Sequence, residues 1–204
     1  MREIEIYGRI AIIMNKGILL VLSGPTCSGK DTVMKLLLEG NKNMQRLVTT
    51  NSRPKRDDEK EGVDYYFVSR DEFERLINKG AFFEWVEYRG HYRGGQKKHV
   101  IKALNSGKDV IWRIDVRGVK NIYEKVKEMV PNSIFIILTS PISILRRRSE
   151  RRKTEDKKWE DWGINRAKWE LEQKEDFDYV VVNEEDKLKE TVNKVEEIIE
   201  LERK

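Results

Sequence analysis

The chain has 204 residues, of which 38% are charged and 38% hydrophobic, and its net charge is +5. Its five Trp, seven Tyr and six Phe exclude a disordered chain, and the positive excess is too small for a dedicated nucleic-acid coat. A single cysteine, Cys27, excludes an internal disulfide framework and a cysteine zinc cluster. No apolar run approaches the roughly 18 residues of a membrane span and no signal peptide is recognisable, so we expect a soluble, cytoplasmic protein of one domain.

The first predicted elements are a strand and a helix joined by a glycine-containing loop. Residues 1–16 alternate loosely and suit either a small hairpin or an appended strand. The apolar run 17–22 is typical of a strand buried on both faces of a parallel sheet. Apolar residues at helical spacing follow Lys30, and this helix ends by Gly40. A strand, a loop and a helix in this order open an α/β fold.

The middle of the chain predicts a small β-rich insertion. A polar stretch over 51–63 is too charged for a core, and 64–68 suits a strand. Ser69 with Glu72 three residues later forms a capping box, which predicts the start of a helix. Two further short strands are expected within 84–94, so the insertion spans 51–100.

The parallel pattern resumes after the insertion. Strands are expected over 109–115, 133–138 and 179–183, and helices over 119–129 and 186–202. A basic stretch from Arg146 to Lys153 leads into a charged helical region that bears tryptophans. The parts therefore predict one domain over 1–204, in which a parallel-sheet core (17–50, 101–145 and 173–204) carries helices on both faces.

The loop after the first strand has the Gly-x-x-x-x-Gly-Lys pattern of a phosphate-binding loop. Glycines let successive backbone N–H groups face one anion, the helix N-terminus adds its positive dipole end, and Lys30 adds a full charge. The pattern predicts that the ATP phosphates contact Gly24, Pro25, Thr26, Cys27, Ser28, Gly29, Lys30, Asp31 and Thr32.

One residue of this loop departs from the usual pattern. Asp31 follows the lysine, where Ser or Thr usually supplies a hydroxyl to Mg²⁺. A carboxylate is also a hard oxygen ligand, so Asp31 is our candidate for the Mg²⁺ that accompanies ATP. Thr32 can supply a hydroxyl instead, and Asp31 can equally cap the helix. Cys27 is interpreted as a small packing residue rather than a nucleophile.

A second anion site is predicted in the polar stretch of the insertion. Arg53 and Arg56 stand three residues apart, and Tyr65 follows after a short spacer. The planar fork of arginine binds two phosphate oxygens at once, which lysine does not do. Arginines in charged loops are also commonly just solvated, so the pair by itself leaves both interpretations open.

The order of these motifs resembles the guanylate kinase family. The resemblance extends over about residues 18–200, and the motifs that carry it are 23–25, 29–30, 49–56, 62–69, 83–85, 90–94, 114–118 and 180–183. Asp31, Arg113 and the run 152–155 look most like the plant-organelle type of that family. A P-loop NTPase-type core with a nucleoside-monophosphate-binding lobe over 51–100 and a helical lid over 146–172 is what the resemblance implies.

The resemblance also implies Mg²⁺-dependent transfer of the ATP γ-phosphoryl group to GMP, and to dGMP. Arg53, Arg56 and Tyr65 would hold the phosphate of GMP. Thr49, Glu84 and Asp115 would bind guanine, whose N1–H and exocyclic amine are donors that suit carboxylate acceptors.

Four residues depart from the family pattern. Thr49 stands where serine is frequent and keeps a hydroxyl, whereas Gly95 replaces a hydroxyl residue and loses one contact. Arg93 replaces a tyrosine at the GMP phosphate, where a cation can do the same work. Arg113 replaces an aspartate near the metal and can place a cation over the phosphates.

Arginines of the lid are expected to contact the ATP phosphates. Arg148 and Arg152 match two of them, and together with Lys30 and Arg53 they make up the predicted catalytic set. The ungapped match to a third falls on Gly163, with Arg166 about one helical turn later. Asn183 matches a position near the adenine.

Three other functions compete with a GMP kinase. A non-catalytic guanylate-kinase-like module would bind a protein ligand, but such modules have degraded phosphate loops. The related ribose-bisphosphate phosphokinases also carry Asp after the loop lysine but would not need the Arg53 and Glu84 groups. A basic surface over 146–153 would bind nucleic acid but lacks interleaved aromatic residues. We therefore expect ATP and GMP as partners and neither nucleic acid nor membrane; the sequence gives no oligomeric state.

Overall fold

The computed structural model describes residues 17–88, 90–152 and 157–203, so the strand or hairpin expected within 1–16 lies outside the described residues. The core is a five-stranded sheet whose paired strands are all parallel. Its strands, in spatial order, are β2 (Met44–Arg46), β7 (Asp109–Arg113), β1 (Leu19–Ser23), β8 (Ser133–Thr139) and β9 (Tyr179–Val182). The expected α/β fold is confirmed.

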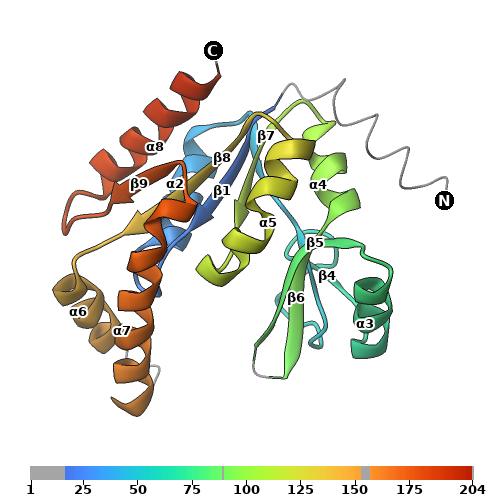
Figure 1. The fold of residues 1–204 in the computed structure, drawn as a ribbon, viewed down its shortest axis with the longest axis horizontal. Coiled ribbons are helices and arrows are strands. Elements are labelled where there is room, and N and C mark those ends of the chain that lie inside the picture. Colours follow the sequence, from blue (N-terminus) through green and yellow to red (C-terminus); the bar gives the residue numbers. More distant parts are fainter. Residues whose placement is uncertain (1–16, 89, 153–156, 204) are drawn as a thin grey trace.

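Helices cover both faces of this sheet, as Figure 1 shows. Helices α2 (Lys30–Gly40) and α8 (Leu188–Glu202) pack with Leu20 and Leu22, whereas α4 (Lys97–Leu104) and α5 (Val116–Met129) pack with Leu19 and Val21. Successive residues of β1 thus enter opposite hydrophobic clusters, and all five are buried. This two-sided burial is the reason why the strand is a continuous apolar run rather than an alternating one.

A second sheet carries the predicted insertion. Its strands, in spatial order, are β4 (Tyr65–Phe67), β3 (Thr49–Asn51), β6 (His91–Gln96) and β5 (Phe82–Tyr88). Ser69 caps α3 (Arg70–Asn78) by accepting a hydrogen bond from the backbone N–H of Glu72, as the capping box predicted. Since β3 begins at Thr49, the second sheet starts two residues before the predicted insertion.

Two helices follow β8 and occupy the region of the predicted lid. They are α6 (Ile142–Arg152) and α7 (Lys157–Glu172), and a 3₁₀ turn (Gln173–Asp176) leads from α7 back to the core. Leu145 of α6 is buried against Ile164 and Ala167 of α7, and Cys27 of the glycine loop packs on the same cluster. Cys27 is therefore a packing residue between the loop and α6, as the sequence suggested.

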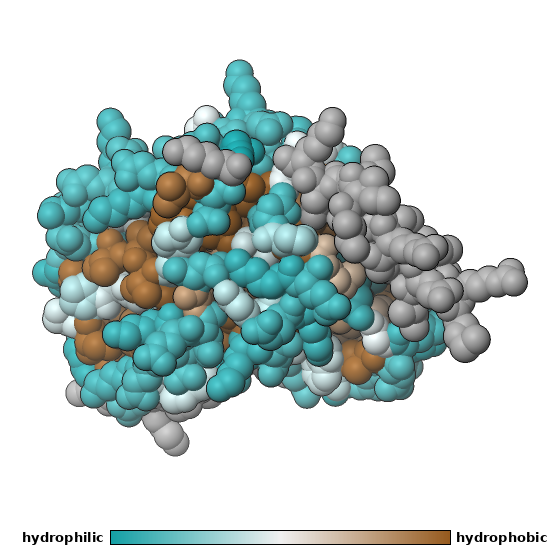
Figure 2. All heavy atoms as spheres, turned by 45° about the horizontal axis from the view of Figure 1, so that its top comes forward, coloured by the Kyte–Doolittle hydropathy of each residue, from teal (hydrophilic) through white to brown (hydrophobic). Residues whose placement is uncertain are grey.

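The exterior is charged with scattered apolar side chains. Figure 2 shows hydrophilic residues interspersed with brown apolar ones on the side where β9 and α8 lie. Val180, Val182 and Leu201 are the large exposed apolar side chains of these two elements. No helix in the described part of the chain is long and apolar enough to cross a membrane.

The carboxyl ends of the core strands point to one edge. The loop after β1, Asp115 after β7, Ser140 after β8 and Asn183 after β9 all lie there. In Figure 1 the second sheet and the α6–α7 pair stand on opposite sides of this edge. Ligands of open parallel sheets bind outside the carboxyl ends of the strands, so this edge is the place to look for a site.

Candidate functional site

The glycine loop has a backbone that only particular residues allow. Gly24 has a φ of 142° and Gly29 a φ of 97°, both outside the range that side chains favour. A Cβ at Gly24 would come under 3.0 Å from the carbonyl oxygen of Leu138, and one at Gly29 would also come under 3.0 Å from the side-chain amide nitrogen of Asn183. Helix α2 begins at Lys30, directly after Gly29, so its first backbone N–H groups point toward the loop. The predicted strand–loop–helix unit is confirmed.

Lys30 lies over the mouth of this loop. Its ammonium group donates hydrogen bonds of 2.7 Å to the carbonyl oxygens of both Gly24 and Pro25. Burial lowers the pKa of Lys30 to about 8, against an opposing effect from the charge of Glu170. A partly buried cation whose hydrogen bonds within the described residues go to carbonyl oxygens is well placed to attract an anion.

Two residues from other elements fasten the loop. The Asn183 side chain is buried, donates to the Ser28 carbonyl at 2.8 Å and accepts from the Thr191 hydroxyl at 3.1 Å. Arg148 of α6 donates to the Ser140 hydroxyl at 3.2 Å and to the Cys27 carbonyl at 3.4 Å. Asn183, expected near adenine, thus supports the loop backbone. The Arg152 side chain lies outside the described residues.

Asp31 and Arg113, two of the unusual residues, form an ion pair. A guanidinium nitrogen of Arg113, at the end of β7, lies 2.6 Å from the Asp31 carboxylate on α2. The Arg113 side chain is 28% exposed and that of Asp31 59%. The positive charge of Arg113 and the negative charge of Asp31 balance one another, so the two departures from the family pattern compensate electrostatically.

A cluster of arginines surrounds Tyr65 on the second sheet. The guanidinium carbons of Arg93, Arg53 and Arg46 lie 5.1, 5.4 and 5.5 Å from the centre of its ring. Both terminal nitrogens of Arg53 also contact the Glu59 carboxylate. These hydrogen bonds lower the pKa of Glu59 to about 2. Four groups suited to a phosphate therefore meet at one place, while Arg56 remains exposed.

Glu84 and Asp115 lie close to each other, between the second sheet and α5. Burial raises the pKa of Glu84 to about 8; the charge of Asp115 raises it further, and that of Arg93 opposes this. Glu84 approaches α5 at Gly118, where an added Cβ would be 3.2 Å from its carboxylate. Thr49, the third predicted guanine contact, is 7% exposed.

Asp115 is held by two arginines. It caps α5 by accepting from the Arg117 backbone N–H at 3.0 Å, and Arg166 of α7 forms an ion pair with it and with Glu170. Burial opposes ionisation of Asp115, but the contacts with Arg117 and Arg166 outweigh it and lower the pKa. Arg166 thus connects α7 to the predicted guanine site.

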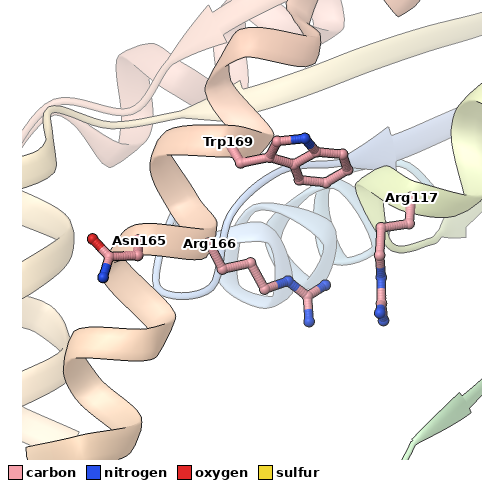
Figure 3. A pocket seen from close by; sticks show the side chains of 4 residues that line it. All are labelled: Arg117, Asn165, Arg166 and Trp169. Carbon is pink, nitrogen blue, oxygen red and sulfur yellow. The ribbon is translucent and has the colours of Figure 1, made fainter.

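A pocket of about 340 Å³ opens beside these arginines and is lined by Arg117, Asn165, Arg166 and Trp169. In Figure 3 the Arg117 and Arg166 side chains extend into the same space beneath the indole of Trp169, and Asn165 points away from it. Trp169 is 42% exposed. The indole of Trp169 is therefore partly solvent-exposed where it lines this pocket.

The two predicted phosphate sites share one electrostatic neighbour, Arg113. Burial lowers the pKa of both Lys30 at the glycine loop and Arg93 on the second sheet, and the charge of Arg113 lowers both further. The charge of Asp115 acts on Lys30 and on Glu84, where it adds to the effect of burial in raising the pKa of Glu84. The loop and the arginine cluster thus both lie within the electrostatic reach of Arg113 at the carboxyl edge.

Sequence reasoning missed two members of this arrangement. Glu59 lies in an acidic stretch in which nothing distinguishes it from its neighbours, and its contact with Arg53 depends on how that loop turns. Arg46 ends β2, outside every motif considered, and reaches Tyr65 only through the packing of the two sheets. Its position seven residues before Arg53 is the sequence feature that could have suggested it.

The chain is similar to known proteins over most of its length. The profile of the family described as guanylate kinase matches residues 16–202. The guanylate kinase of Latilactobacillus sakei subsp. sakei (strain 23K) is 39% identical over 190 residues, which cover 92% of this chain and 91% of that protein. That of Halalkalibacterium halodurans is 40% identical over 185 residues, with coverage of 90% and 88%. The crystal structure of guanylate kinase from Anaplasma phagocytophilum has a TM-score of 0.66 and 33% identity, covering 93% of this chain and 88% of that one.

Proposed function

Because the chain belongs to the guanylate kinase family, and so transfers a phosphoryl group from ATP to GMP, we propose which of its residues perform each part of that reaction. The loop 24–32 with Lys30 holds the ATP phosphates, and the arginine cluster around Tyr65 holds the phosphate of GMP. The observation that carries this assignment is the position of Arg113 at the end of β7, where it contacts Asp31 next to Lys30 and its charge also acts on Arg93 of the arginine cluster.

Guanine recognition falls to Glu84, Asp115 and Thr49. An ionised carboxylate is only an acceptor, and the Watson–Crick edge of guanine presents two adjacent donors, N1–H and the 2-amino group. Adenine lacks that pair of donors, so AMP would leave a buried carboxylate without partners, which is strongly unfavourable. Glu84 is partly buried and lies within the electrostatic reach of Asp115, which supports this assignment.

Transfer requires positioning and charge stabilisation rather than a covalent intermediate. The phosphate of GMP is the nucleophile and is ionised at neutral pH, so no general base is needed. Lys30, the loop N–H groups, Arg148 and Arg152 stabilise charge on the moving phosphoryl group. Arg53 and Arg56 hold the acceptor in line, with Glu59 fixing the orientation of Arg53.

Arg113 supplies a further cation at this centre. It is the residue whose charge acts on both Lys30 and Arg93, and Asp31 holds its guanidinium in place. We assign it to stabilising negative charge between the two nucleotides. On the basis of Asp31 and Arg113 we also propose that the chain is most similar to the plant-organelle type of the family.

The residues present fit Mg²⁺ only as a companion of ATP. Within the described ranges, no group of three or more His, Cys, Asp or Glu could hold a metal ion. Mg²⁺ commonly binds one or two carboxylates together with substrate phosphates. Asp31 or the Thr32 hydroxyl would be the protein ligand, and the bound ion would neutralise charge on the ATP phosphates.

The three parts of the chain divide these tasks. The core (17–50, 101–145 and 173–204) carries the phosphate loop, the lobe (51–100) binds GMP, and the lid (146–172) closes over ATP. Closing both lobes excludes water, which would otherwise hydrolyse ATP. The two alternatives, a non-catalytic module and a ribose-bisphosphate phosphokinase, are disfavoured because guanylate kinases that are 39–40% identical match nine-tenths of the chain.

A substrate panel tests the proposal. In a coupled assay of ADP release, ATP is offered with GMP, dGMP, AMP, UMP or ribose 1,5-bisphosphate. We expect turnover with GMP, reduced but measurable turnover with dGMP, and rates at least about 10²-fold lower with AMP and UMP. Turnover of ribose 1,5-bisphosphate instead of GMP would contradict the assignment of the arginine cluster.

A further inference from the structure

Glu170 is a buried acidic residue to which the proposed reaction gives no task. It lies on α7, and its side chain is only 4% exposed. Burial raises its pKa, while the charge of Arg166 and a hydrogen bond from that residue oppose this effect. A buried ion pair seldom stabilises a fold more than well-packed apolar residues of similar volume do. A buried carboxylate in this helix therefore needs an explanation other than stability.

The contacts of Arg166 connect Glu170 to the core. Glu170 accepts a hydrogen bond of 2.7 Å from Nε of Arg166, which stands one helical turn before it. Nη2 of the same guanidinium donates to Oδ2 of Asp115. Because a guanidinium is planar and rigid, a partner that fixes Nε also fixes the direction of Nη2. Glu170 thus determines where Arg166 points.

Asp115 is accessible to a ligand, whereas Glu170 is not. The Asp115 side chain is 25% exposed, against 4% for that of Glu170. Arg117 and Arg166, which both contact Asp115, line the pocket of about 340 Å³, and Figure 3 shows their side chains extending into the same space. Glu170 therefore acts on a ligand through Arg166 and Asp115 rather than by touching it.

We propose that Glu170 is a positioning residue, which holds the Arg166 guanidinium against Asp115 and so gives the lid helix a part in the recognition of guanine. The inference rests on the proposed function of Asp115. Two donors of Arg117 hold Oδ1 of Asp115 from within the core, and Arg166 holds Oδ2 from the lid. A carboxylate that is ordered before the base arrives accepts a directed hydrogen bond at a smaller entropic cost.

The test compares GMP with inosine monophosphate (IMP), whose base lacks the 2-amino donor of guanine. The wild type prefers GMP in kcat/KM, because carboxylates placed for two donors reject a base with one. Glu170→Leu keeps the buried volume but removes the acceptor for Nε. The preference then falls about tenfold through a higher KM for GMP, and the KM for ATP stays within about twofold. Glu170→Gln retains an acceptor and recovers most of the preference, whereas Glu172→Gln, on the exposed side of the same helix, is the matched control.

A double variant separates positioning from packing. In an Asp115→Asn background, Glu170→Leu changes the preference no further, since its effect passes through Asp115. An unchanged preference in Glu170→Leu alone would overturn the proposal. Equal losses with GMP and IMP together with a lower Tm would assign Glu170 to packing and overturn it too. A wild type that does not prefer GMP to IMP is a different result, because it removes the proposed function of Asp115 and this inference with it.

A change at Arg166 covers the case in which Glu170→Leu does not fold. Lysine keeps the positive charge but lacks the planar fork that holds two carboxylates in fixed directions. Arg166→Lys therefore loses about tenfold of the preference for GMP over IMP, and Lys168→Ala, an exposed residue of the same helix, loses none. A wild-type preference in Arg166→Lys would overturn the proposal equally.

Discussion

The two halves of the site are held together by different interactions. In the glycine loop, Lys30 contacts carbonyl oxygens and Asn183 supports the backbone through its amide. On the second sheet, Arg53 is held by the charged Glu59, and Glu84 lies beside the charge of Asp115. One half is therefore fixed by hydrogen bonds to the main chain and the other by charges.

The two kinds of interaction respond differently to solution conditions. Hydrogen bonds from Lys30, Asn183 and Arg148 to main-chain carbonyl oxygens give the glycine loop a shape that depends little on salt. The charge of the loop does depend on pH, because the pKa of Lys30 is lowered to about 8. Ion pairs such as Arg53–Glu59 are weakened by salt, so we expect salt to act mainly on the half proposed for GMP. The following predictions test the two halves and the ion pair between them.

The largest effect is expected from Lys30→Ala, which removes the charge of the loop while other contacts hold its backbone. GMP-dependent ADP release falls by about 10²–10³-fold. Lys35→Ala, on the exposed face of the same helix, is the matched control and keeps wild-type activity. The Tm of Lys30→Ala stays near that of the wild type, and full activity in this variant would remove the loop from the mechanism.

A smaller, pH-dependent effect is expected at Glu84, whose pKa is raised to about 8. The ionised form accepts from guanine, so at saturating ATP the KM for GMP falls as pH rises from 7 to 8 and levels off above, with a slope approaching tenfold per pH unit. Glu84→Gln removes this dependence, and Glu87→Gln on the exposed side of the same strand retains it. An identical pH profile in wild type and Glu84→Gln would contradict the assignment.

Stability changes in the opposite direction at Glu84. A carboxyl group whose pKa is raised in the folded state stabilises the fold fully below its ordinary pKa of 4.5, and this contribution is lost as pH rises through about 8. Glu84→Gln therefore raises the Tm at pH 8.5 by a few degrees, since 1 kcal/mol shifts the Tm of a chain this size by roughly 2–4 °C. Loss of GMP binding with a gain in stability identifies a functional, strained carboxylate.

The smallest effects are expected at the ion pair between the halves. Arg113→Ala lowers kcat about tenfold with little change in either KM, and Asp31→Asn lowers it about threefold. If Asp31 acts by holding Arg113, the double variant is no worse than Arg113→Ala. Additive losses, with a higher Mg²⁺ concentration at half-maximal rate in Asp31→Asn, would assign Asp31 to the metal instead. Arg75→Ala, an exposed arginine on α3, is the control.

Several elements of the core and of the insertion could be predicted from the sequence because their causes are local. The run 17–22 gave the buried strand, the capping box at Ser69 gave the start of α3, and the glycines around Lys30 gave the loop. Hydrophobic periodicity and the backbone freedom of glycine depend on a few neighbouring residues, so both can be recognised from the sequence without knowledge of the fold. The residues proposed for guanine came from the resemblance and stay a prediction.

Contacts between distant residues could not be predicted in this way. The sequence identified Asp31 and Arg113 as two separate departures, and only the structure joins them, although they are 82 positions apart. It presented Gly95 as a lost hydroxyl, and only the structure places the Trp112 indole there. No sequence pattern indicated that the Trp169 side chain is exposed or that Glu59 pairs with Arg53.

The amino-acid order alone determined a two-sided parallel sheet, a phosphate-loop backbone and a β-rich insertion, since backbone hydrogen bonding and apolar burial follow from neighbouring residues. Tertiary structure alone decided which long side chains meet. The partner of Arg53 depends on how its loop turns, and the partner of Arg113 on how α2 packs beside β7. The neighbour of Trp112 depends on how the two sheets meet. In each case a shift of about one ångström makes or breaks the contact. In this protein the secondary structure is therefore determined by neighbouring residues, whereas the ion pairs of the site arise from tertiary packing.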